Sequence, residues 1–223
     1  MNNEEIIRFL RELKENNYRE WFLDNKKRYE AAKDAFTDNV QQLINKIALF
    51  DPEVAGVEAK NCVFRIYRDV RFSPDKTPYK THFGAYMARG GRVSERAGYY
   101  LHIEPDGSLL SGGIYMPQPK FLKVLRQDIY DQIDELMNII EEPSFKETYP
   151  SLDGEVLKRN PAGFPESPYD NIIRHKDFCV VSHKPDHFFL QEDWQEKSLE
   201  DFRKLFPFNR FLNYSVDEYK DRI

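Results

Sequence analysis

The residues best suited to chemistry stand in one short stretch, residues 65–80, which reads RIYRDVRFSPDKTPYK. Arginine presents a planar fork of N–H donors that matches carboxylate and phosphate groups, and lysine adds a compact positive charge. The sequence therefore predicts that this stretch binds a small anionic ligand, either phosphorylated or carboxylated. The candidate ligand-binding residues are Arg65, Arg68, Arg71, Lys76, Tyr79 and Lys80.

The same stretch contains two carboxylates, Asp69 and Asp75. They suggest an alternative interpretation, an internal salt-bridge network that locks helices to a sheet. Asp69 is also a candidate catalytic residue. However, Arg68 and Arg71 beside it favour its charged form, which suits an orienting or metal-binding role better than proton abstraction. Because the cations outnumber the carboxylates, the stretch favours an anion site over a closed network.

Two histidines are better candidates for proton transfer than Asp69. His82 stands at the start of a predicted strand, two residues after the stretch ends, and His102 shares one face of another strand with Tyr100 and Glu104. A single histidine in a strand is nevertheless often structural. An enzyme that acts on a phosphate-containing substrate, with His82 or His102 in proton transfer, is therefore the second hypothesis.

Charge is distributed unevenly along the chain. The net charge is -5, yet residues 60–96 hold nine basic and three acidic side chains, so the rest of the chain is strongly acidic. A local positive field in an acidic protein suits a small anion and argues against a broad nucleic-acid surface. Aromatic residues interleave with the cations, as in stacking platforms for single strands. A single-stranded nucleic-acid or protein-interaction module is therefore a third hypothesis.

Motifs for known catalytic, metal or cofactor sites are missing from the sequence. There is no GxSxG elbow, GxxxxGK[ST] phosphate loop, GxGxxG turn or HExxH helix. His183 and His187 have helical spacing, but Pro185 between them makes a helical metal pair improbable. Cys62 and Cys179 are too far apart for a CxxC motif. The sequence therefore predicts no metal site and no cofactor.

Composition describes a soluble globular chain. Of its 223 residues, 40% are hydrophobic and 32% are charged, which suits a core inside a solvated surface. No apolar run approaches the length of a membrane span, and the segment MNNEEIIRFL lacks the basic and apolar regions of a secretory signal. We therefore expect a cytoplasmic protein with no membrane partner.

The elements that must position these residues follow from hydrophobic periodicity. Helical spacing predicts a helix over residues 4–15, a long helix that Asn17 caps and that ends before Asp51, and a helix over 119–140. Two final helices are predicted at about 192–206 and from Pro207 onward. Alternation with a period of two predicts strands at 62–67, 82–88, 98–104, 108–116 and 177–183.

Turn signals connect the predicted strands. Residues 104–107, Glu-Pro-Asp-Gly, predict a tight hairpin between the third and fourth strands. Gly112 and Gly113 inside the fourth strand indicate a bulge or a place where another segment approaches the backbone closely.

Hairpin-linked strands in the middle of the chain, with helices at both ends, predict an α+β fold. We expect a central antiparallel sheet with helices packed against it, an N-terminal helical hairpin and C-terminal helices. The short connections between the strands leave no room for the crossover helices of a parallel sheet. No repeat or linker divides the chain, so a single α+β domain over residues 1–223 is expected.

The stretch at 65–80 also resembles the signature of a bacterial family, domain of unknown function 2461, which reads RxxRDxRFxxxxKxPYK. Its fixed positions are all present, as Arg65, Arg68, Asp69, Arg71, Phe72, Lys76, Pro78, Tyr79 and Lys80. The likeness extends over FLRELKENNYREWF, GYYLHIEPDGSLLSGGIYMP and the region from KRNPAGFP to IIRHKDF. The resemblance implies one full-length domain and no particular substrate.

Overall fold

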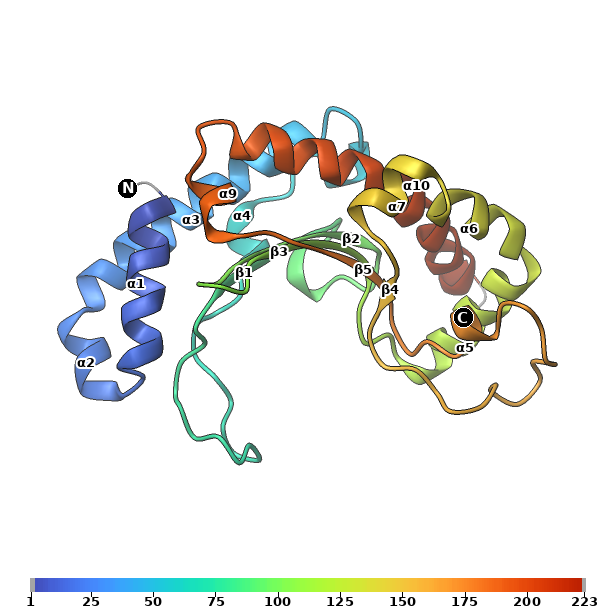
Figure 1. The fold of residues 1–223 in the computed structure, drawn as a ribbon, viewed down its shortest axis with the longest axis horizontal. Coiled ribbons are helices and arrows are strands. Elements are labelled where there is room, and N and C mark those ends of the chain that lie inside the picture. The colour runs from blue at the N-terminus through green and yellow to red at the C-terminus, as the bar shows by residue number, and fades with distance from the viewer. Residues whose placement is uncertain (1–2, 222–223) are drawn as a thin grey trace. The chain divides into compact units, whose positions relative to one another are not determined.

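The computed structural model describes residues 3–221 (Figure 1). Its strands form one five-stranded antiparallel sheet in the order β1-β2-β3-β5-β4, with helices before and after the strands along the chain. The predicted α+β fold, with N-terminal and C-terminal helices, is therefore confirmed. No helix in residues 3–221 is both long enough and apolar enough to cross a membrane.

The elements are short strands and helices of very different length. The strands are β1 (Phe83–Met87), β2 (Gly98–Ile103), β3 (Leu109–Ile114), β4 (Leu152–Asp153) and β5 (Phe178–His183). The helices are α1 (Asn3–Glu15), α2 (Arg19–Asp24), α3 (Lys26–Ile47), α4 (Ala59–Cys62), α5 (Pro119–Asp131), α6 (Ile133–Ile140), α7 (Pro143–Thr148), α8 (Asp170–Ile173), α9 (Asp186–Leu190) and α10 (Trp194–Asp221). Two 3₁₀ turns, η1 (Pro52–Val54) and η2 (Gly91–Val93), complete them.

The chain divides into two compact units. Unit 1 contains the residues up to Arg92, then Tyr100–Leu110 and His183–Leu199. Unit 2 contains Val93–Tyr99, Ser111–Ser182 and the residues from Glu200 onward. The chain enters each unit more than once, and the single domain over 1–223 stays a prediction.

In unit 1, helices α1 and α3 lie side by side and α3 packs on β1 (Figure 1). The contact is aromatic: the ring of Phe83 in β1 lies 5.4 Å from that of Phe36 and 6.2 Å from that of Tyr29, between centroids. Because strand side chains alternate, the neighbours of Phe83, His82 and Gly84, face away from α3. The helices of unit 1 thus leave that face of β1 to polar side chains.

In unit 2, the C-terminal helix α10 is tied to the start of β2 by a buried amide. The side chain of Asn213 accepts a hydrogen bond from the Ala97 amide at 2.8 Å and donates to the Ala97 carbonyl at 3.1 Å. The neighbouring residue Arg96, one of the cations of residues 60–96, is buried and paired with Asp217 of α10. At the sheet edge, β4 pairs with β5 in the register Leu152↔Val180.

The predicted second helix is two helices, α2 and α3. They separate at Asn25, whose side-chain amide donates to the Trp21 carbonyl at 3.0 Å and so competes with helical hydrogen bonding. The predicted cap at Asn17 is wrong, because Tyr18 occupies the N-cap position of α2 without a side-chain hydrogen bond. Asn17 instead binds the backbone of Tyr79, 62 residues away.

Two other helix predictions differ in extent. The helix predicted over 119–140 is interrupted at Gln132, which separates α5 from α6. The two final helices are one continuous helix, α10, with Pro207 inside it. Pro207 lies on the exposed side of α10, where water can satisfy the carbonyl that the missing N–H would have bonded. A proline inside a pattern therefore need not end a helix.

The predicted strand at 62–67 is wrong, whereas the central hairpin is confirmed. Cys62 ends the short helix α4, and the residues after it form only isolated bridges, Val63↔Ala85 and Tyr67↔Tyr79. The turn at 104–107 closes with a hydrogen bond from the Gly107 amide to the Glu104 carbonyl at 3.1 Å. The strands at 82–88, 98–104, 108–116 and 177–183 are each shortened by one to three residues.

The buried histidine of unit 2 predicts a pH dependence of stability. His175 is buried, its Nδ1 has no hydrogen-bond partner among the described residues, and burial lowers its pKa from the ordinary 6.5. In acid the unfolded chain therefore takes up the proton more readily, so stability is lost as pH falls below 6.5. Urea unfolding at about pH 7.5 and about pH 5.5 should show a larger loss for the wild type than for His175→Gln. Equal losses would contradict the assignment.

Candidate functional site

The stretch rich in arginine and lysine forms a narrow, two-legged arm in unit 1, residues 64–81, between α4 and β1 (Figure 1). Its legs run antiparallel. The Arg68 amide donates to the Pro78 carbonyl at 2.9 Å, and the Lys80 amide donates to the Ile66 carbonyl at 2.8 Å. Proline cannot donate to such a ladder, so the pairing is too sparse for a regular strand.

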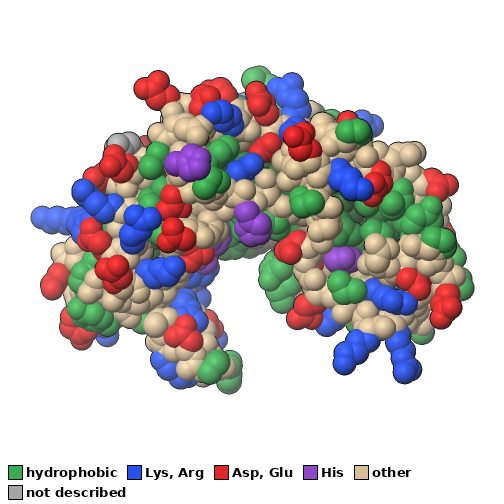
Figure 2. Space-filling model, viewed as in Figure 1, with side chains coloured by type: hydrophobic (Ala, Val, Ile, Leu, Met, Phe, Trp, Pro, Cys, Tyr) green, Lys and Arg blue, Asp and Glu red, His purple; other side chains and the backbone are tan. Residues whose placement is uncertain are grey.

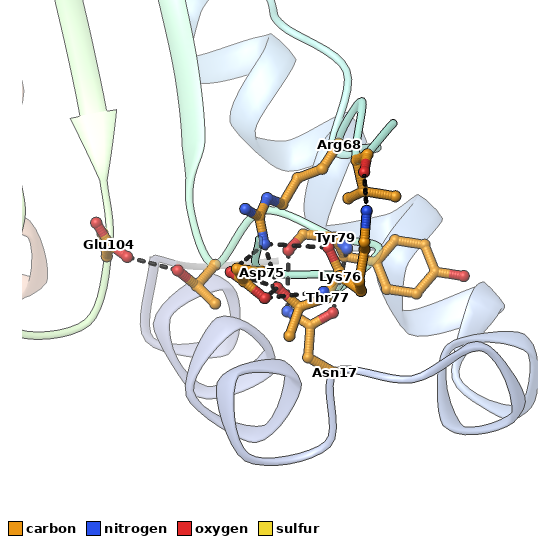
Figure 3. A network of polar contacts seen from close by, with 9 residues as sticks. Asn17, Arg68, Asp75, Lys76, Thr77, Tyr79 and Glu104 are labelled. Atoms are coloured by element: carbon orange, nitrogen blue, oxygen red, sulfur yellow. Dashed lines mark hydrogen bonds and ion pairs between the residues drawn. The ribbon is translucent and has the colours of Figure 1, made fainter. Parts of the chain in front are cut away.

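Tyr79 anchors the second leg of the arm to the N-terminal helices. Tyr79 is 5% exposed, and its ring stacks on that of Phe22 in α2, with centroids 3.9 Å apart. The Asn17 side chain donates to the Tyr79 carbonyl at 2.9 Å and accepts from its amide at 3.1 Å (Figure 3). The ring predicted to bind a ligand is therefore buried among the aromatic side chains of unit 1.

Arg68 is held inside the arm. Its guanidinium donates to Asp75 Oδ2 at 2.5 Å, to the Thr77 carbonyl at 3.1 Å and to the Thr77 hydroxyl (Figure 3). The Thr77 amide and the guanidinium of Arg68 together lower the pKa of Asp75 to about 2. At this position the structure matches the salt-bridge network that the sequence analysis offered as the alternative.

The cations near the tip of the arm are engaged as well. Arg71 donates to both carboxylate oxygens of Asp69, the shorter distance being 2.6 Å, and this contact lowers the pKa of Asp69. The Lys76 ammonium donates to the Val70 carbonyl at 2.9 Å (Figure 3). In Figure 2 the arm shows basic, acidic and hydrophobic side chains together, without an uninterrupted basic surface.

Because Asp75 is exposed and Arg68 only half-buried, we expect their ion pair to contribute little to stability. Arg68→Ala should change Tm by no more than about 2 °C, since water screens the charge of Asp75 when its partner is removed. Differential scanning calorimetry at neutral pH measures this. A fall of more than about 5 °C would mean that the network holds unit 1 together.

Two cations of the stretch, Arg65 and Lys80, make no ion pair among residues 3–221. Arg65 is exposed, whereas Lys80 is half-buried with its ammonium 5.4 Å from the ring centroid of Phe64. Burial lowers the pKa of Lys80, and the positive charge of Arg65 acts in the same direction. These two charges are close enough to repel each other. Neither forms an ion pair with a described carboxylate, although the charge of Arg65 also lowers the pKa of Asp69, which Arg71 binds.

Two histidines and a carboxylate come together where β1 begins and β2 ends: His82 directly precedes β1, His102 lies in β2 and Glu104 directly follows it. The rings of His82 and His102 stack with centroids 4.1 Å apart. Nε2 of His102 lies 3.0 Å from Oε2 of Glu104, and its Nδ1 lies 2.9 Å from the Tyr100 hydroxyl. The Thr81 hydroxyl donates to the other Glu104 oxygen, Oε1, at 2.6 Å (Figure 3). We call His82, His102 and Glu104 the histidine cluster.

Strand alternation explains why the cluster faces one side. Every second residue along β2 and into the turn after it is polar, namely Tyr100, His102 and Glu104. The intervening Leu101 and Ile103 are fully buried in the core. The polar face predicted for the third strand is thereby confirmed. A one-residue change of register would exchange the polar and apolar sets.

Gly84 leaves the space that the Tyr100 side chain occupies. A Cβ atom at Gly84 would lie 2.6 Å from the Tyr100 hydroxyl oxygen. The Tyr100 ring also meets that of Phe64 edge-on, with centroids 6.3 Å apart. Tyr100 therefore lies across Gly84, in a position from which its hydroxyl reaches His102.

The cluster contains two neutral imidazoles and one carboxylate near neutral pH. Burial lowers the pKa of His82 to about 4, and the adjacent His102 acts in the same direction. Burial also lowers the pKa of His102, although Glu104 opposes the effect. For Glu104 burial acts to raise the pKa, but hydrogen bonds from Thr81 and His102 outweigh it and leave the pKa lowered. Such groups can accept a proton or coordinate a cation.

The structure thus separates the predicted residues into two sets. The first set is His82 and His102, whose rings are in contact, with Lys80 two residues before His82. The second set lies near the tip of the arm, where Arg71 binds Asp69 and Lys76 binds the Val70 carbonyl. Sequence analysis missed Thr81, because no local signal in the sequence distinguishes it from the other threonines. Sequence alternation did indicate Tyr100 and Glu104 as neighbours of His102.

One family of proteins matches almost the whole chain. The family model described as a conserved hypothetical protein, DUF2461, matches residues 5–211, a span that includes the arm and the histidine cluster. No curated protein and no solved structure matches the chain.

Proposed function

The chain belongs to the DUF2461 family of conserved hypothetical proteins, and from this premise we propose that it binds a small phosphorylated or carboxylated ligand at Arg65 and Lys80. The observation that carries the proposal is that neither cation has an ion-pair partner in the part of the chain that the structure describes. Three of the five cations in the stretch are engaged within the arm, whereas these two make no ion pair among the described residues.

Burial of Lys80 gives the physical reason. A half-buried ammonium loses part of its hydration, and buried charges in proteins are usually paired. An anionic group placed between Lys80 and Arg65 would offset this cost and would also relieve the repulsion between the two cations. The guanidinium of Arg65 is exposed and can offer two parallel donors to a phosphate or carboxylate.

The test compares the ligand affinities of variants that each lose one positive charge, at different positions of the arm. Isothermal titration with inorganic phosphate, a sugar phosphate, adenosine monophosphate and citrate should identify at least one ligand. Arg65→Gln and Lys80→Met should then each raise Kd by about tenfold or more, the effect of losing one charge-assisted hydrogen bond.

Arg71→Gln is the matched control, because it removes an exposed arginine from the same arm that already has a carboxylate partner. It should change Kd by no more than about twofold. An equal loss in all three variants would indicate diffuse electrostatic attraction and would overturn the proposal. Absence of binding by every ligand would overturn it too.

A second candidate function is an enzyme that acts on a phosphate-containing substrate. It is favoured by the hydrogen-bonded chain of Tyr100, His102 and Glu104, which fixes the orientation of an imidazole beside the proposed anion site. Arg65 and Lys80 would then stabilise negative charge that develops on the substrate.

The test of this second candidate is turnover. A panel of phosphoesters should include one that the protein hydrolyses, with activity lost in His102→Gln and retained in Arg71→Gln. A protein that binds an anion but hydrolyses none of the panel is a binder and not an enzyme.

A further inference from the structure

We propose that His82, His102 and Glu104 bind one divalent first-row transition-metal ion, of the class of Zn²⁺ or Fe²⁺. One ligand atom from each of the three residues lies within 4.8 Å of the other two. Two imidazoles and one carboxylate form the ligand set of many catalytic zinc sites and of non-haem iron sites. The proposal concerns a cation, so it does not rest on the proposed anion site.

The distances allow coordination after a small movement. Ligand atoms that share one ion at about 2.0–2.2 Å lie about 3–3.5 Å from one another. Nε2 of His102 and Oε2 of Glu104 already meet this requirement at 3.0 Å. The ring nitrogens of His82 make no hydrogen bond to described residues, so a shift of roughly 1–1.5 Å to complete the set breaks none.

Two contacts outside the ligand set support the ligands as they do in known metal sites. The Tyr100 hydroxyl meets Nδ1 of His102 at 2.9 Å, and the Thr81 hydroxyl donates to Oε1 of Glu104 at 2.6 Å. Partners of this kind orient the ligating nitrogen and oxygen and typically change metal affinity by about 10–100-fold. They leave Nε2 and Oε2 as the atoms that face each other.

The proton on His102 changes place when the metal binds. Without metal, Nε2 carries the hydrogen and donates it to Glu104, because two acceptors would otherwise face each other at 3.0 Å. With metal, Nε2 uses its lone pair for the metal bond, so its hydrogen leaves and Nδ1 becomes protonated. Nδ1–H then donates to the Tyr100 oxygen. The imidazole is neutral in both states, so the change of tautomer releases no net proton.

Three protein ligands leave coordination positions open. In catalytic zinc sites such a position holds water or the oxygen of a substrate. Lys80 lies two residues before His82 and carries a charge that opposes a nearby cation. We therefore expect Lys80→Met to leave metal affinity unchanged or to increase it, whereas the proposed anion site loses affinity with the same substitution.

The experiment uses the full chain after dialysis against EDTA. Titration with Co²⁺, followed by its visible absorption, and calorimetric titration with Zn²⁺ should both show one ion per chain with Kd of about 10 μM or lower. His82→Gln and His102→Gln should each raise Kd for Zn²⁺ by about 100-fold or more, and Glu104→Gln by about tenfold or more.

The matched control is the pair of exposed histidines elsewhere in unit 1. His183→Gln combined with His187→Gln should leave Kd and the Co²⁺ spectrum unchanged. The proposal would be overturned if the control variant lost as much Zn²⁺ affinity as the ligand variants, or if the wild type bound Zn²⁺ with a Kd no lower than about 1 mM. Should circular dichroism show that a ligand variant does not fold, Tyr100→Phe serves instead: it should raise Kd by about tenfold, and an unchanged Kd would overturn the proposal.

Failure of this proposal can be distinguished from failure of the anion site. Zn²⁺ binding that survives in Lys80→Met while phosphate binding is lost supports two separate sites. Phosphate binding by EDTA-treated protein, with no Zn²⁺ binding, leaves the anion site standing and overturns the metal site.

Discussion

Gly113→Ala is expected to destabilise the protein by about 3–5 kcal/mol, or to prevent folding altogether. Gly113 lies in β3 with φ +107, a conformation that residues with a side chain rarely adopt. A Cβ atom there would also lie 2.1 Å from the Phe178 carbonyl oxygen and 2.7 Å from the Cys179 Cα. Both obstacles are backbone atoms of β5, so no side-chain rotation relieves them. Urea unfolding measures the loss.

Gly163→Ala separates the two causes. Gly163 also has positive φ, +94, but nothing lies within 4 Å of its Cβ position. This substitution should cost only about 1–2 kcal/mol, the strain of the backbone conformation alone. Similar losses of unfolding free energy in the two variants would show that the close approach of β5 to Gly113 adds nothing to the cost of the substitution.

Phe22→Ala is expected to cost about 3–5 kcal/mol, because it removes a buried aromatic ring. Phe22 is 2% exposed and contacts Tyr79 and Tyr29, with ring centroids 3.9 and 5.0 Å away. Since the stack with Tyr79 anchors the arm, hydrogen exchange of the Lys80 amide should also become faster. Urea unfolding and exchange measured by mass spectrometry test the two parts.

Phe72→Ala is the control for the same chemical change. Phe72 is 94% exposed at the tip of the arm and contacts the guanidinium of Arg71 at 5.9 Å from the ring centroid. We expect a change within about 0.5 kcal/mol. A large effect of Phe72→Ala, or a small effect of Phe22→Ala, would contradict the assignment of the anchor.

Much of the fold could be predicted because its signals are local. The turn at 104–107 and the alternation through Tyr100 and His102 locate the central hairpin, and paired glycines mark where β5 approaches β3. Local signals failed where a distant partner decides the structure. Asn17 has the side chain of a helix cap, yet it binds the Tyr79 backbone. Pro207 has the signal of a helix end, yet it lies within α10.

The site was predictable only in part for the same reason. Each histidine was a candidate for proton transfer because of its residue type and its position in a strand. The contact between His82 and His102 depends on how β1 pairs with β2, and the spacing of residues in the sequence does not reveal that pairing. The histidine cluster therefore forms no metal-binding motif that can be recognised in the sequence, because 20 positions separate His82 from His102. The pairing of Arg68 with Asp75, by contrast, was weighed as an alternative from the count of nearby charges.

The construction of the arm implies that its tip can be severed without dismantling the site. The side chains of the proposed sites come from the two ends of the arm and from β2, and none comes from Phe72 or its neighbours. Exposed loop tips are preferred targets of proteases. A chain cut beside Phe72 would still be joined by the Tyr67↔Tyr79 bridge and the Tyr79 anchor. Its two fragments should therefore stay together and act as one protein.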